Sequence, residues 1–111
     1  MLFMVMSEFD LSHIPTDPKQ MAAFAELVLI PSLEMIQKWE EEGLILAGGI
    51  RAGGHECVYI VDVASNEQLS DYLQSMPGWT FSHIETAPLE NTEHRINKMK
   101  GRLERLKALV G

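Results

Sequence analysis

Two strand-like stretches that follow one another in the middle of the chain constrain its fold most. They read LILAGGIRAG, residues 44–53, and HECVYIVDV, residues 55–63, and they meet at Gly53 and Gly54. A pair of glycines between two strand patterns is typical of the tight turn of a β-hairpin. Helices must therefore lie before and after this pair of strands rather than between them.

Two further strands and two helices are expected around the hairpin. MLFMVMSEF, residues 1–9, alternates but is apolar on both faces, as in a central strand. WTFSHIETAPL, residues 79–89, also alternates and is expected to form the fourth strand. A helical pattern runs from about 18 to 42, beginning at Asp17-Pro18 and ending before Gly43. Pro31 is expected to kink or break this helix near residues 29–30.

The second helix is expected to begin after Ser65, with Gln68 three residues on in the spacing of a capping box. It should end near Met76, before Pro77-Gly78. The resulting order, β-α-β-β-α-β, predicts an α+β fold of the ferredoxin-like type, with an antiparallel sheet and both helices on one face. The other face would carry exposed apolar side chains and needs a cover. A second copy of the chain, packed sheet to sheet, is the simplest cover and would make a dimeric α+β barrel.

Residues 91–111, NTEHRINKMKGRLERLKALVG, form a third helical pattern with apolar residues at steps of three and four. We therefore divide the chain into a ferredoxin-like domain, residues 1–90, and a basic amphipathic C-terminal helix, residues 91–111. Residues 93–110 carry a net charge of +4. Because the net charge of the whole chain is −7, the remaining residues carry −11. The helix either packs its apolar side on a neighbouring subunit or acts as a contact arm for an acidic partner.

Composition narrows the functional classes. A length of 111 residues suits one compact domain, and a net charge of −7 argues against nucleic-acid binding by the body of the protein. A single cysteine, Cys57, excludes an intrachain disulfide and a thiolate-rich metal site. No secretory signal or membrane-spanning stretch is recognised, so a cytoplasmic protein without membrane contact is expected.

The glycine-rich segment GGIRAGG, residues 48–54, does not fit a nucleotide-binding loop. A phosphate-binding loop needs a lysine and a following helix, and a dinucleotide fingerprint also needs a helix after it. Here a strand follows. His55 and Cys57 lie on one face of that strand, but no second pair of ligands accompanies them, so no metal and no cofactor are expected.

Polar residues on the last two strands predict a small-molecule pocket. In the fourth strand Trp79, Phe81, His83 and Glu85 share a face, and in the third His55, Cys57 and Tyr59 do. A histidine and a carboxylate two residues apart can act as an acid/base pair for proton abstraction next to a carbonyl. Arg51 would then hold a substrate carboxylate. The catalytic candidates are His83, Glu85, Arg51 and His55, and the substrate-binding candidates are Met4, Met6, Tyr59, Trp79 and Phe81.

The segments MLFMV, EEGLILAGGIRAGG, YIVDVASNEQLSDYLQSMP and HIETAPL together resemble the muconolactone isomerase family, over roughly residues 1–90. The resemblance implies a homodimeric α+β barrel that assembles further and a cofactor-free enzyme of aromatic catabolism that moves a proton within a lactone. It also implies that Glu85 corresponds to one acidic residue of the family's final strand and that His83 replaces another. The family's histidine falls on Gly54, next to His55, and Arg51 is displaced by one residue from the family's arginine.

We therefore expect an isomerase-like enzyme for a small carboxylated lactone or enone, acting without a cofactor. Two alternatives remain open. The same barrel also suits a cofactor-free monooxygenase or a polyketide cyclase-like enzyme with a larger aromatic ligand. The third possibility is a non-catalytic module that binds a small molecule or serves assembly.

Overall fold

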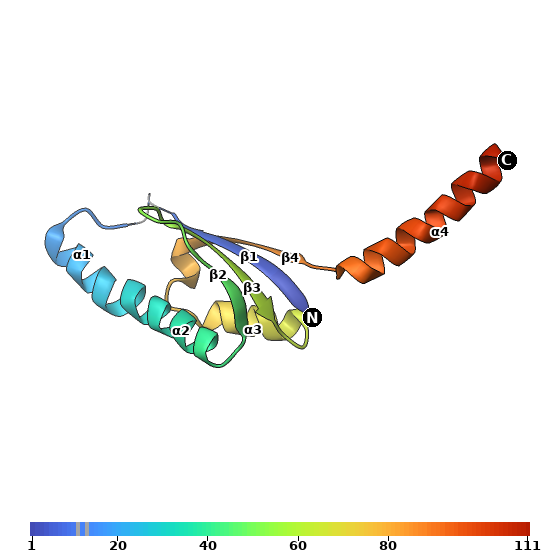
Figure 1. Cartoon of the computed structure of the whole chain (residues 1–111). Coiled ribbons are helices and arrows are strands. Elements are labelled where there is room, and N and C mark those ends of the chain that lie inside the picture. The colour runs from blue at the N-terminus through green and yellow to red at the C-terminus, as the bar shows by residue number, and fades with distance from the viewer. Residues whose placement is uncertain (11, 13) are drawn as a thin grey trace.

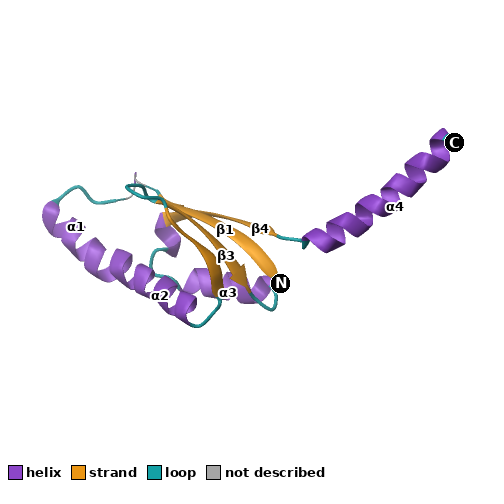
Figure 2. Ribbon diagram, viewed as in Figure 1, coloured by secondary structure: helices purple, strands orange, loops and turns teal. Residues whose placement is uncertain are grey.

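The structure, a computed structural model, describes all residues except 11 and 13. Figure 1 shows the elements in chain order and Figure 2 shows them by type. The strands are β1 (Leu2–Phe9), β2 (Ile45–Ile50), β3 (Glu56–Asp62) and β4 (Ser82–Pro88). The helices are α1 (Pro18–Phe24), π-helical η2 (Ala25–Leu29), α2 (Ile30–Glu41), α3 (Asn66–Ser75), 3₁₀-helical η3 (Trp79–Phe81) and α4 (Thr92–Val110).

The four strands form one antiparallel sheet in the order β2-β3-β1-β4. The helices from α1 to α3 cover one face of this sheet, as Figure 1 shows. The ferredoxin-like α+β fold expected from the sequence is thereby confirmed. β1 lies in the middle, with Met6 opposite Val58 of β3 and Glu85 of β4.

The core lies between the sheet and the helices. It is built from the side chains of β1 and β3 that point toward the helices, Phe3, Val5, Tyr59 and Val61 among them. Each fully buried side chain of this size contributes about 1.5–3 kcal/mol of transfer free energy. Trp39 of α2 also belongs to the core, and its ring meets that of Tyr72 edge-on, with 5.4 Å between centroids. This contact joins the two helical segments over the sheet.

Pro31 does not break the first helix. The segment before it, Ala25–Leu29, widens into a π-helical turn, and α2 continues from Ile30 with Pro31 in its first turn. A proline lacks the N–H that an α-helix needs, and its ring crowds the carbonyl four residues earlier. A π-turn changes the spacing of the backbone groups at that point, so the helix continues through the proline.

The fourth strand begins later than the sequence predicts. Trp79 and Phe81 belong to η3, and β4 starts at Ser82. Pro77-Gly78 ends α3, and the Gly78 carbonyl then accepts hydrogen bonds from the Phe81 N–H at 3.1 Å and the Ser82 hydroxyl at 2.8 Å. These short-range bonds keep the segment helical. The prediction that Trp79 and Phe81 share a strand face with His83 and Glu85 is therefore wrong.

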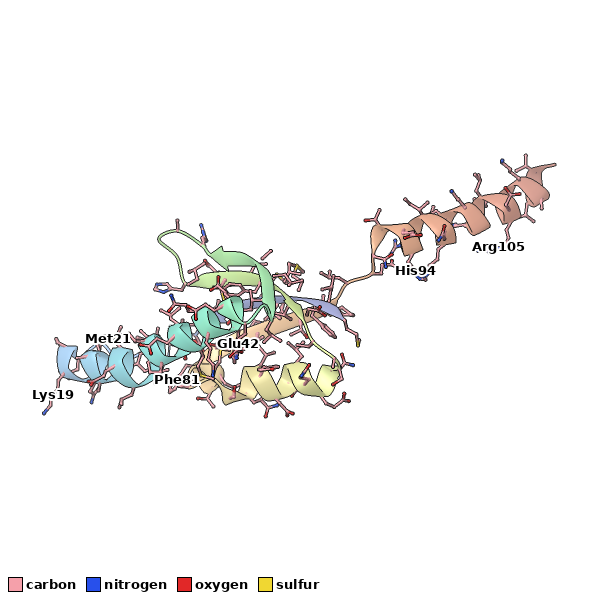
Figure 3. All side chains as sticks on the ribbon, turned by 60° about the horizontal axis from the view of Figure 1, so that its bottom comes forward. Lys19, Met21, Glu42, Phe81, His94 and Arg105 are labelled. Carbon is pink, nitrogen blue, oxygen red and sulfur yellow. The ribbon has the colours of Figure 1, made fainter. Side chains whose placement is uncertain are left out.

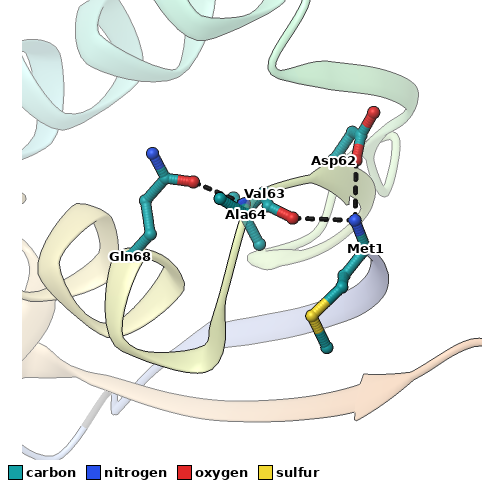
Figure 4. Close-up of polar contacts among 5 residues, drawn as sticks. All are labelled: Met1, Asp62, Val63, Ala64 and Gln68. Atoms are coloured by element: carbon teal, nitrogen blue, oxygen red, sulfur yellow. Dashed lines mark hydrogen bonds and ion pairs between the residues drawn. The ribbon is translucent and has the colours of Figure 1, made fainter.

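Polar contacts fix the corner between β3 and α3, which Figure 4 shows in detail. The Met1 ammonium lies 3.1 Å from the Asp62 carboxylate and donates to the Val63 carbonyl at 2.8 Å. The Gln68 side chain accepts from the Ala64 N–H at 2.6 Å. Ser65 caps α3 by accepting from the Gln68 N–H at 3.1 Å, as the sequence predicts. This corner holds the start of β1 against the end of β3.

Two surfaces of the molecule remain uncovered. The sheet face opposite the helices carries Leu2, Met4 and Met6 of β1 and Val58 and Ile60 of β3. α4 projects from the end of β4 away from the body, so the chain measures 73 × 29 × 25 Å (Figure 1). A helix over this segment was expected and is confirmed, whereas the division into a domain and a tail, and the dimer, remain predictions.

Two neighbouring glycines of β2 provide a matched test of how closely β2 approaches β3. Gly48 has φ +115°, and a Cβ there would lie 2.1 Å from the Val58 carbonyl oxygen, whereas Gly49 has no atom within 4 Å of its Cβ position. We expect Gly48→Ala to lower the free energy of unfolding by at least about 1–3 kcal/mol, the usual cost of backbone strain. Gly49→Ala should change it by less than about 1 kcal/mol. Urea denaturation measures both, and equal effects would contradict the close approach of β2 to β3.

Candidate functional site

The predicted site residues lie on two sides of the sheet. One group surrounds a shallow depression in the uncovered sheet face, which we call the open-face hollow. Its volume is about 230 Å³, and its lining includes Met6, Glu8, Glu56, Val58, His83 and Glu85. A second group lies around a cavity of about 250 Å³ between the sheet and the first helices, which we call the helix–sheet cavity. Strand alternation separates the two, because successive side chains point to opposite faces.

His83 and Glu85 are in contact in the open-face hollow. The His83 Nε2 atom lies 3.2 Å from the Glu85 Oε1 atom, and both side chains are about two-thirds exposed. The pair is positioned by β1, because His83 lies opposite Glu8 and Glu85 opposite Met6. A carboxylate at this distance fixes the orientation of the imidazole and leaves the Nδ1 atom to exchange a proton with a ligand.

Arg51 lies in the β2–β3 turn, where it forms an ion pair with Glu56. The Arg51 Nη1 atom is 3.3 Å from the Glu56 Oε2 atom, and the Arg51 N–H donates to the Glu56 carbonyl at 2.9 Å. A backbone hydrogen bond at Glu56 itself and the Arg51 guanidinium lower the pKa of the Glu56 carboxyl, against a smaller opposing effect of desolvation. The arginine expected to hold a substrate carboxylate is thus already paired with a carboxylate of the protein.

Three glutamates give the open-face hollow an acidic lining. Glu8 and Glu56 lie opposite each other on β1 and β3, and Glu85 projects from β4 on the same face. Glu8, Glu56 and Val58 are not among the site residues that the sequence predicts. Glu8 continues the alternation of Met4 and Met6 and could have been assigned to this face. Its proximity to Glu56 depends on the strand register, which the pattern alone leaves open.

His55 does not reach the open-face hollow. It lies just before β3 and lines the helix–sheet cavity, together with Phe9, Met21, Leu29, Ile36 and Met76 among others. Tyr59 also points toward the helices, where it is buried in the core. Burial raises the pKa of its phenol, and the nearby Cys57 and Glu40 add to the effect. Neither residue shares a face with the His83–Glu85 pair.

The two aromatic candidates likewise lie on the helix side. Phe81 packs edge-on against Phe24 of α1, with 5.0 Å between ring centroids, and Figure 3 shows it where the helical layer meets the sheet. Trp79 lines a separate depression beside α3, with Leu69 and Thr86. Of the substrate-binding candidates, Met6 lines the open-face hollow and Met4 precedes it on the same face of β1. The structure thus brings together His83, Glu85, Met4 and Met6, and separates them from His55, Tyr59, Trp79 and Phe81.

Two general features bear on the kind of site. Within the described part of the chain, no three His, Cys, Asp or Glu side chains form a group that could hold a metal ion. Over the same residues, no helix has both the length and the apolar character needed to cross a membrane.

Comparisons with known proteins identify relatives. A family model described as muconolactone delta-isomerase matches residues 1–95. A crystal structure of muconolactone isomerase is similar, with a TM-score of 0.68, 28% identity, and coverage of 82% of this chain and 90% of that one. 5-Chloro-2-hydroxyhydroquinone dehydrochlorinase from Burkholderia phenoliruptrix AC1100, solved with 2,5-dihydroxybenzoquinone, has a TM-score of 0.59 at 11% identity and covers 85% of this chain and 98% of its own. The latter likeness concerns the fold alone. Comparison with curated proteins yields no match.

The reactivity of the partly buried Cys57 thiol tests the packing around this residue. Burial raises the pKa of its thiol, although hydrogen bonds with Ser7 oppose the shift. Because the thiolate is the reactive form, we expect Cys57 to react with Ellman's reagent at about pH 8 at least roughly tenfold more slowly than a free thiol. The rate should increase as the pH rises further. The same protein in concentrated guanidinium chloride is the control, and an equal rate in both states would contradict the packing around Cys57.

Proposed function

The chain belongs to the muconolactone delta-isomerase family, and from this premise we propose that it isomerises a small carboxylated lactone or enone without a cofactor. The observation that carries the proposal is the contact between His83 and Glu85 at 3.2 Å in the open-face hollow. The family and the fold support a small-molecule enzyme of the isomerase type. The roles of individual residues below are part of our proposal.

The proposed reaction is a proton shift next to a carbonyl. Glu85 accepts a hydrogen bond from the Nε2–H of His83, so the Nδ1 atom is free to take a proton from the carbon beside the carbonyl. The electron pair of the broken C–H bond moves into an enolate. His83 then returns the proton to a more distant carbon of the conjugated system, which relocates the double bond and restores the neutral imidazole. Glu85 stabilises the imidazolium during this exchange.

Apolar side chains of the open-face hollow would support the ring of such a substrate. Met6 and Val58 lie opposite each other on β1 and β3 beside the His83–Glu85 pair. Flexible methionine side chains adapt to a ligand of irregular shape. A substrate carboxylate would meet the acidic lining and would compete with Glu56 for Arg51. Binding of an anionic substrate therefore requires a cation in addition to Arg51.

Proton exchange in deuterated buffer tests the proposal directly. Muconolactone and related unsaturated lactones would be incubated with the protein and followed by proton NMR. We expect His83→Asn and Glu85→Gln each to lower the rate of exchange and isomerisation by about 10²-fold or more, the usual contribution of a positioned acid/base group. Glu26→Gln, at an exposed carboxylate on η2, is the matched control and should leave the rate unchanged. Turnover that persists in both site variants would exclude the His83–Glu85 pair as the catalytic group.

The helix–sheet cavity supports a second candidate function. It is lined largely by apolar side chains of the first helices and the sheet, with Ser7, Ser32, Ser82 and His55 as polar groups. Such a cavity suits a larger aromatic ligand, as in a cofactor-free monooxygenase, a polyketide cyclase-like enzyme or a small-molecule-binding module. Oxygen uptake distinguishes the monooxygenase from an isomerase. Activity that His55→Asn abolishes and that His83→Asn leaves intact would favour this cavity over the open-face hollow.

A further inference from the structure

We propose that α4 of one copy of the chain packs against the outer side of the continuous helix α1–η2–α2 of a second copy. The family match ends at residue 95, so almost all of α4 lies beyond it. The contact does not use the open sheet face, which therefore stays available for the sheet-to-sheet packing that the sequence predicts. It does not depend on the reaction proposed above.

α4 carries an exposed apolar stripe. The α4 stripe consists of residues that recur at steps of three and four along the helix, namely Ile96, Met99, Leu103, Leu106 and Val110. Figure 3 shows the side chains of α4, with His94 and Arg105 labelled, standing clear of the body. An apolar stripe along a charged helix is typical of a helix that packs against another surface.

Cations border the α4 stripe on both sides and disfavour the pairing of two α4 helices. At roughly 100° per residue, Arg95 and Arg102 lie along one edge of the stripe, and Lys100 and Lys107 lie along the other. When two helices pair through such a stripe, the side chains at these edges meet across the interface in either orientation. Two α4 helices would therefore place cations against cations. The α4 stripe instead favours an apolar surface with acidic neighbours.

The helical layer exposes an apolar surface of this kind. Across α1, η2, α2 and α3, all of whose residues the structure describes, the exposed large apolar side chains are Leu27 at 68%, Ile30 at 51% and Leu33 at 45%. Ala23, which is also exposed, lies four residues before Leu27. We call these four residues the outer helix patch. A row of exposed apolar side chains, as distinct from a single one, marks an interaction surface.

The helix that carries the outer helix patch is acidic, which complements α4. Residues 18–42 contain five glutamates and two lysines, a net charge of −3, whereas residues 93–110 carry +4. Of the two lysines, Lys38 is paired with Glu42, with 3.8 Å between the Nζ and Oε1 atoms. Glu34 lies four residues after Ile30 and therefore on the same side of α2, beside the patch. The two apolar surfaces are thus flanked by charges of opposite sign.

The two surfaces also match in length and alignment. The outer helix patch extends over about 15 Å and the α4 stripe over about 21 Å, at about 1.5 Å per residue. We align the two helices by placing Leu103, the centre of the α4 stripe, on Ile30. Glu34 then meets Lys100 when the helices run antiparallel, and it meets Arg102 when they run parallel. The apolar and the charged contacts therefore form in the same alignment.

The same copy cannot supply both surfaces in the arrangement that the structure shows. α1 and α4 lie at opposite ends of the chain, whose longest dimension is 73 Å (Figure 1). At the start of α4 the Glu90 carboxylate pairs with Arg95, and Asn91 accepts a hydrogen bond from the His94 N–H at 2.7 Å. These contacts fix the first turn of α4 where it leaves the sheet. A second copy is therefore the source of the partner helix.

Disulfide trapping tests this contact. The trapping variant carries Ile30→Cys and Leu103→Cys, and Cys57→Ser removes the native thiol in all variants. In the control, Gln74→Cys at an exposed position of α3 replaces Ile30→Cys. Under mild oxidation the trapping variant should form covalent dimers or larger products at least roughly tenfold faster than the control, because facing thiols have a high effective concentration. Each single-cysteine variant, Ile30→Cys or Leu103→Cys, should react as slowly as the control.

Charge reversal in the trapping variant tests the ionic contact. Glu34→Lys alone, and Lys100→Glu together with Arg102→Glu, should each slow trapping by at least about threefold. All three changes together should restore the rate, because the pairs then form with reversed sign. Glu67→Lys, at an exposed position of α3, is the matched control and should leave the rate unchanged.

Four outcomes would overturn the proposal. The first is trapping that is no faster in the trapping variant than in the control. The second is equally fast trapping with Leu103→Cys alone, as in pairing of two α4 helices. The third is a disulfide within a single chain, which a denaturing gel distinguishes from a covalent dimer. The fourth is a combined charge reversal that fails to restore the rate. Trapping is measured without substrate, so its failure would leave the isomerase proposal unaffected.

Discussion

The alternation of side chains along β1 is the constraint on which the rest of the structure depends. As the central strand, β1 sets the faces of β3 and β4 through hydrogen-bonded registers. Phe3 and Val5 point toward the helices and anchor the core, so Met4 and Met6 must point to the opposite face. A shift of one residue would move every one of these side chains to the other side of the sheet. The same register that builds the core thus brings His83 and Glu85 beside Met6 in the open-face hollow.

The distribution of charge is the second organising feature. The helical and sheet layers are strongly acidic, whereas α4 concentrates most of the cations of the chain. Within the body, Arg51 is paired with Glu56, and at the start of α4 Glu90 is paired with Arg95. Two glutamates of the sheet face, Glu56 and Glu85, therefore have local partners in Arg51 and His83, whereas the cations of α4 beyond Arg95 lie on a separate part of the molecule.

Sequence patterns predicted the elements well where local and tertiary preferences agree. Side chains alternate clearly along β1 and β3, and apolar residues recur with helical spacing along α3 and α4. Asp17 and Ser65 cap their helices as expected. The predictions failed where nearby backbone bonds competed with the pattern. Trp79 and Phe81 alternate as in a strand, but the bonds to Gly78 form a 3₁₀ turn. Pro31 was expected to kink or break the helix near residues 29–30; the helix is not broken there, and a π-helical turn over Ala25–Leu29 precedes the proline.

The sequence by itself determined the α+β architecture, the family, and the proximity of His83 to Glu85, because two residues on one face of a strand are neighbours in any register. Only the tertiary structure decided which residues from different strands meet. It placed Glu8 and Glu56 beside the His83–Glu85 pair, paired Arg51 with Glu56, and assigned His55 and Tyr59 to the opposite side of the sheet. Contacts between strands depend on register and turn geometry, which are set by packing of the whole core and are not encoded in the spacing of any single segment.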